Sequence, residues 1–140
     1  MSITTYFYIA DDIQTLNDSK VLIVGAYPDR VIILNMPRLD GLKPTLATPI
    51  GIPKLCAMVT VKGLLPGAVR IVPRLIYPGG ISSDLQFGSI ESVLPENQDS
   101  ANFLLAFTPF PVVGSGKYAV EFEVQGHTVH EEFELRVNEI

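Results

Sequence analysis

Tryptophan is absent from the sequence, and cysteine occurs once, as Cys56. A single thiol cannot form an intrachain disulfide, so a disulfide-stapled fold is excluded. Charged residues make up only 18% of the 140 residues, and 10 basic against 15 acidic side chains give a net charge of −5. That sign opposes a sequence-independent grip on nucleic-acid phosphates or on an anionic membrane surface. We therefore expect neither nucleic acid nor a membrane as a partner.

Long apolar runs are also missing. The longest candidate, residues 21–36, is interrupted by Pro28, Asp29 and Arg30, whereas a membrane-spanning helix needs about 20 apolar residues. The first residues lack the basic and apolar regions of a signal peptide, which together with the lone cysteine predicts a cytoplasmic protein. The hydrophobic content of 47% and the mean hydropathy of +0.31 suggest apolar surface kept for a partner or a second copy.

Alternating apolar and polar residues dominate what is present, most clearly in residues 116–137. This stretch predicts an antiparallel hairpin with one buried face. The register stays open, because a turn at Gln125-Gly126 places His130 opposite Glu121, whereas a turn one residue later places it opposite Glu123.

Similar patterns predict the other strands, and no segment shows helical periodicity. The expected strands cover residues 3–10, 20–27, 31–34, 55–62, 69–77, 85–94 and 101–108. Residues 20–27 are so apolar that we expect a central strand covered on both faces, with Gly25 at a bulge or a close backbone approach. Pro73 predicts an edge or a bulge in its strand. The fold class is all-β: a single domain, residues 1–140, built as an immunoglobulin-like antiparallel two-sheet β-sandwich of eight or nine strands.

Residues 36–53 interrupt this rhythm with four prolines and two glycines. They predict an extended loop that either packs along its own domain or reaches a neighbouring chain. Its apolar residues are the candidate interface: Met36, Leu39, Leu42, Leu46, Ile50 and Ile52.

Motifs for catalysis, metals or cofactors are not convincing. Residues 114–117 resemble the end of a phosphate-binding loop, but Pro111 occupies the first glycine position and Tyr118 replaces the Ser or Thr that would hold magnesium. His127 and His130 lie three apart on an extended strand and point to opposite faces, which does not suit a shared metal. We therefore expect no catalytic residue, no metal ligand and no cofactor.

Five further side chains invite structural explanations. Asp11 and Asp12 diverge, so capping of a turn at a strand end outweighs metal binding. Cys56 has no neighbouring base, which favours a packed thiol. Tyr6 and Tyr8 share one side of their strand and could contact a ligand, but packing in the core is the favoured expectation.

The order of these features resembles a family of small bacterial immunoglobulin-like β-sandwich domains of unknown function. The resemblance is carried by the sequences at residues 11–13, 20–27, 52–55, 116–118 and 133–137, and it covers nearly the whole chain. The sequence departs from the family in Ala10, where a cysteine often stands, and in its proline-rich insertion. The resemblance implies the fold and transfers no functional residue.

The leading hypothesis is a non-enzymatic interaction module, a homo-oligomer or a subunit of a larger assembly, whose partner is itself or another protein. The alternative is a small-molecule or carbohydrate-binding domain that uses loop ends and tyrosines such as Tyr27 and Tyr77.

Overall fold

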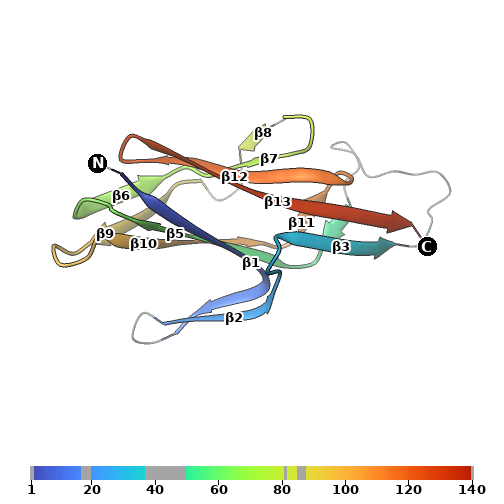
Figure 1. Cartoon of the computed structure of the whole chain (residues 1–140), viewed down its shortest axis with the longest axis horizontal. Helices are drawn as coiled ribbons and strands as arrows, with labels where there is room; N and C mark the ends of the chain where they lie inside the picture. Colours follow the sequence, from blue (N-terminus) through green and yellow to red (C-terminus); the bar gives the residue numbers. More distant parts are fainter. Residues whose placement is uncertain (1, 17–19, 37–49, 81, 85–87, 140) are drawn as a thin grey trace.

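A computed structural model describes residues 2–16, 20–36, 50–80, 82–84 and 88–139 of the chain (Figure 1). Within these ranges the protein is all-β, as predicted, with no helix long and apolar enough to cross a membrane. The strands are β1 (Thr4–Thr15), β2 (Val21–Ala26), β3 (Val31–Met36), β4 (Ile50–Ile52), β5 (Leu55–Lys62), β6 (Gly67–Ile71), β7 (Arg74–Ile76), β8 (Ser82–Asp84), β9 (Ile90–Leu94), β10 (Ser100–Phe107), β11 (Phe110–Val112), β12 (Gly116–Val124) and β13 (His127–Glu139).

These strands form two larger sheets and two short pairs. The larger sheets have the orders β10-β5-β1-β2 and β3-β13-β12-β7-β8, and the pairs are β11-β4 and β6-β9. Each pairing in the described ranges is antiparallel except β3 with β13, which is parallel. The expectation of a purely antiparallel arrangement is therefore wrong at this pair, because β3 joins the sheet beside the last strand of the chain and not beside a hairpin neighbour.

The expected number of eight or nine strands is also wrong, since thirteen occur in the described part of the chain. One reason is Pro73, which divides the expected strand at 69–77 into β6 and β7. The sequence predicted an edge or a bulge at Pro73; the structure has a break between two strands there, because proline cannot donate to a ladder. The two pieces pair with different partners, β9 and β12.

The expectation of a doubly covered strand at 20–27 is wrong. β2 is the last strand of its sheet, and none of its side chains is fully buried. The doubly covered strand is β5, which lies between β1 and β10 and buries six of its eight residues. Gly25 does mark a close approach, because a side chain there would collide with the carboxylate of Asp11, and its φ of 68° suits glycine.

The main hydrophobic core receives side chains from both larger sheets. Phe103 of β10 meets Phe122 of β12 with ring centroids 5.4 Å apart. Phe7 of β1 meets Phe133 of β13 at 6.2 Å. These contacts join segments that are far apart in sequence, and burying such rings is the main source of stability in the fold.

A second, smaller apolar cluster lies against the other side of β5. In Figure 1 the second half of β1 bends and runs with β2 as a hairpin that projects from the body of the molecule. This hairpin brings Ile13, Val21 and Ile23 together with Cys56 and Met58 of β5. The cluster explains why β5 is buried on both faces.

The closing hairpin, β12 and β13, confirms its prediction and resolves its register. Gln125 and Gly126 have φ values of 47° and 81°, which suit a two-residue turn with both central residues left-handed. Glu121 therefore lies opposite His130.

Tyr118 near the start of β12 is fully buried, yet its hydroxyl group forms hydrogen bonds within the chain. The hydroxyl donates to the carbonyl of Gly114 at 2.7 Å and accepts from the N–H of Val113 at 3.0 Å. Burial is the main reason why the pKa of this phenol is raised. The tyrosine thus fixes the path of the loop before β12.

We predict that Tyr118→Phe lowers the free energy of unfolding by about 1–3 kcal/mol, because it leaves partly buried backbone groups of Val113 and Gly114 without their partner. Urea denaturation would measure the change. Tyr8→Phe is the matched control, since that side chain is exposed. Equal effects from both substitutions would contradict the assigned role of the Tyr118 hydroxyl.

Candidate functional site

A groove opens where the chain passes from β6 to β7. Val72 and Pro73 lie between these strands, and β7 pairs with β12 only over residues 74–76. β12 continues for three residues beyond Glu121, its last residue paired with β7. Because Pro73 has no N–H to extend the ladder, the two chains diverge there and leave a gap beside the end of β12.

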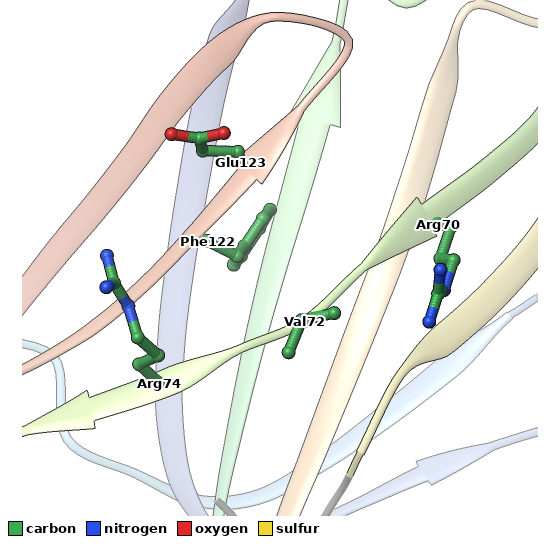
Figure 2. Close-up of a pocket in the computed structure, with 5 residues that line it drawn as sticks. All are labelled: Arg70, Val72, Arg74, Phe122 and Glu123. Atoms are coloured by element: carbon green, nitrogen blue, oxygen red, sulfur yellow. The ribbon is translucent and has the colours of Figure 1, made fainter. Parts of the chain in front are cut away.

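The groove has a volume of about 460 Å³ and is lined by Arg70, Val72, Arg74, Phe122 and Glu123. Figure 2 shows Val72 between Arg70 of β6 and Arg74 of β7, with Glu123 across from them on β12. Phe122 belongs to the buried core, whereas Val72 is 52% exposed. The groove therefore combines an apolar floor with a charged rim.

Side-chain contacts limit the groove at both ends. At one end Arg74 forms an ion pair with Glu121. At the hairpin tip, the Gln125 amide accepts from the Leu65 N–H at 2.8 Å and donates to the Leu65 carbonyl at 2.9 Å. Only three residues of β12, 122–124, separate these contacts, so the groove suits a small group better than a long segment.

The charges of the groove are largely neutralised within the chain. Besides the Arg74 pair, Arg70 lies 3.8 Å from Glu91. Glu123 has no ion pair within the described ranges. A groove with engaged arginines and one carboxylate exerts little net attraction on an anion, and we assign no ligand to it.

The first half of β1 presents an open edge on the other side of the molecule. Residues 4–10 pair with β5 on one side. On the opposite side the N–H of Tyr27 donates to the carbonyl of Ile9 at 2.9 Å. Backbone groups alternate in direction along a strand, so those of Thr5 and Phe7 face the same side as that carbonyl. No strand in the described ranges pairs with them there.

Tyr6 and Tyr8 project from the outer face of this sheet, where they are 46% and 41% exposed. The expectation that they pack in the core is wrong, because Phe7 and Ile9 take the inward positions of β1. Neither tyrosine hydroxyl has a hydrogen-bond partner within the described part of the chain.

The interface predicted in the proline-rich loop falls mostly outside the described residues. Leu39, Leu42 and Leu46 lie in the segment 37–49. Met36 and Ile50 are the end of β3 and the start of β4. Ile52 packs against the main core, so its side chain is not free for a partner.

The aspartates do not cap a turn at the end of a strand, because β1 continues to Thr15. Asp11 accepts a hydrogen bond from the Tyr27 hydroxyl at 2.7 Å, and this contact adds to desolvation in raising the pKa of Tyr27 to about 12. Asp12 instead forms an ion pair with Lys54 at 2.7 Å. The two carboxylates therefore diverge, as predicted.

Tyr77, named as a ligand contact in the alternative hypothesis, is buried against Tyr118 and cannot meet a ligand from solution. Cys56 is a buried free thiol. Within the described ranges, no three His, Cys, Asp or Glu side chains lie together so that they could hold a metal ion.

His130 lies at the centre of a polar cluster on the outer face of β12 and β13. Its Nδ1 is 2.7 Å from Glu121 and its Nε2 is 3.2 Å from Glu132. Hydrogen bonding to Glu121 raises the pKa of His130, although burial opposes the shift. The same bond, helped by Arg74, lowers the pKa of Glu121. The cluster is a set of structural ion pairs.

No protein-family model and no curated protein matches the chain.

The sequence analysis did not predict the open edge of β1 or the exposure of Tyr6 and Tyr8. The signal that could have identified the edge is the absence of charged side chains in residues 2–10. The groove depends on the divergence of β6 from β12, and its one sequence signal is Pro73, which neighbours the lining residues Val72 and Arg74.

We predict that the His130 cluster makes stability depend on pH. Because the pKa of His130 is raised on folding, its stabilising effect is present below the ordinary value of 6.5 and is lost as pH rises through the folded value. The wild type should therefore exceed His130→Gln in free energy of unfolding by more at about pH 5.5 than at about pH 8.5. The change should stay below about 1 kcal/mol because the site is exposed.

Denaturant unfolding at the two pH values measures this difference. His127→Gln is the control, because no carboxylate within the described ranges pairs with His127. A difference between wild type and His130→Gln that does not vary with pH would contradict the role given to the cluster.

Proposed function

We propose that the protein is a non-enzymatic, immunoglobulin-like β-sandwich interaction module that works by contact with another protein chain, and that it forms a homo-oligomer. The observation that carries the proposal is the open edge of β1, whose own residues 2–10 carry no charge.

The immunoglobulin-like assignment is supported by Tyr118. In such sandwiches a tyrosine near the start of a late strand bonds through its hydroxyl to the backbone a few residues upstream. Tyr118 has this relation to Gly114, four residues earlier. The contacts of Phe103 with Phe122 and of Phe7 with Phe133 agree with the proposal, since they join side chains of two sheets in one core.

Within its own residues the edge of β1 lacks the features that usually prevent strand pairing between molecules. The charges beside it, on Arg30 and Glu131, are paired with each other at 3.0 Å, and Glu131 also accepts a hydrogen bond from the Thr5 hydroxyl. Edge strands are commonly protected by charges, prolines, bulges or a covering element. Residues 2–10 contain no charged side chain and no proline, and the first charge is Asp11. Each copy carries a net charge of −5, so an uncharged strand is where two copies can approach with the least repulsion.

The available length of this edge favours one symmetric arrangement. β1 begins at Thr4, and Tyr27 occupies the edge at Ile9, which leaves residues 4–8 with Tyr6 at their midpoint. A two-fold axis beside Tyr6 would pair Thr5 of one copy with Phe7 of the second copy, and the reverse. It would place the two Tyr6 side chains next to each other across the axis.

Multi-angle light scattering over a concentration series tests the assembly. We expect the wild type to form dimers and Tyr6→Lys or Tyr6→Glu to shift each variant toward monomer, because like charges would then lie opposite each other. An equimolar mixture of the two variants should restore the dimer through opposite charges.

Tyr6→Phe is the control for the loss of a tyrosine without a new charge, and it should leave the dimer intact. A wild type that stays monomeric at high concentration would contradict homo-oligomerisation. Dimers that form equally well in all three variants would place the interface away from Tyr6.

A further inference from the structure

The outer face of the four-stranded sheet carries a patch of aromatic and neutral polar side chains. Strand register aligns Tyr6 with Thr60 of β5 and Asn102 of β10 in one row across the sheet. The next row is Tyr8, Met58 and Leu104, in which Tyr8 is exposed and Met58 is buried in the smaller cluster. The side chains project perpendicular to the plane of the sheet, so this face stays open when the edge of β1 pairs with another strand.

Uncommitted hydrogen-bonding groups surround the tyrosine rings. The Thr60 hydroxyl donates to the Asn102 side-chain carbonyl at 2.7 Å. This bond orients the Asn102 amide N–H groups, which have no partner within the described ranges. The Tyr6 and Tyr8 hydroxyls are also unengaged, so the patch offers apolar ring surface together with donors and acceptors.

The projecting hairpin gives this face a boundary. Ile13, Val21 and Ile23 of the hairpin pack in the cluster with Cys56 and Met58, and Leu104 of β10 packs against the same cluster, at the end of the patch beyond Tyr8. Because the hairpin projects from the sheet, it bounds the patch on this side as a wall. A ligand lying along β1 would therefore rest on the tyrosines and meet this wall.

The charge around the patch indicates which class of ring-containing ligand could bind there. Aromatic side chains on a sheet also stack nucleobases, but such sites need cations for the phosphates. The two central rows carry no charged side chain, and the adjacent row of Thr4, Lys62 and Ser100 adds one cation. A protein with a net charge of −5 and a single lysine beside the patch does not fit a polyphosphate.

We propose that this patch binds a neutral oligosaccharide, with Tyr6 and Tyr8 packing against the apolar C–H surfaces of sugar rings and with Asn102 and the tyrosine hydroxyls bonding their hydroxyls. The tyrosines are two residues apart and thus about 7 Å apart along the strand, which suits a ligand of at least two linked rings. The site goes beyond the proposed assembly function and does not depend on it.

The test is titration of the full chain with a panel of neutral oligosaccharides: cello-, malto-, xylo-, manno- and chito-oligosaccharides. Polygalacturonate and single-stranded RNA are the charged comparators. Because the chain has no tryptophan, tyrosine emission can report binding beside calorimetry. We expect saturable binding of at least one neutral oligosaccharide, weakened about tenfold by Tyr8→Ala and by Asn102→Ala.

Tyr8→Phe keeps the ring and should change the affinity by less than about threefold. Leu22→Ala, an equally exposed apolar residue on the hairpin, should leave the affinity unchanged. Tyr8 lies away from the proposed two-fold axis, so its variants separate sugar binding from assembly, which light scattering follows in parallel.

Three outcomes would overturn the proposal: no binding of any neutral oligosaccharide at millimolar concentration, binding that Tyr8→Ala leaves intact, or binding of the charged comparators alone. A change of oligomeric state in Tyr8→Ala without any effect on sugar binding would show that the patch is a protein contact instead.

Discussion

The buried ring of Tyr118 joins several elements of the fold, and its hydroxyl joins a loop to them. It packs on Tyr77 beyond β7, on Phe110 of β11 and on Phe133 of β13, with ring centroids 5.6 to 6.0 Å apart. A phenol in such a core must keep its hydroxyl bonded, and the loop at residues 113–114 supplies both partners. Ring packing thereby fixes the loop, and the loop in turn directs β12, around which β7 and β13 pair.

Two interruptions of regular pairing create the surfaces that distinguish this protein. At Pro73 the chain changes partner from β9 to β12, and the groove results. Near Ala10 the partner of β1 changes from β5 to β2, which leaves the edge at residues 4–8 open and lets the hairpin cover β5. In both places the surface feature arises because backbone groups or side chains lose the neighbour that regular pairing would give them.

The sequence predicted features that depend on local pattern. Alternation identified the closing hairpin, Gln125-Gly126 was one of two turns considered, and Pro73 marked an interrupted strand. The doubly covered strand was predicted wrongly, because the apolar content of a strand does not reveal which other element packs on each of its faces. The apolar β2 ends a sheet, whereas β5 gains its second cover from a hairpin distant in sequence. Exposure of Tyr6 and Tyr8 escaped prediction for the same reason, and residues 37–49 lie outside the described structure.

The hairpin over β5 also turns the lone cysteine into a natural reporter. Cys56 is buried beneath Ile13 and its neighbours in the smaller cluster, and no other thiol occurs in the chain. A water-soluble thiol reagent can reach it only when the structure above it opens locally. The rate of its modification therefore measures how often this region opens in the native protein, with no introduced label and no background from a second site.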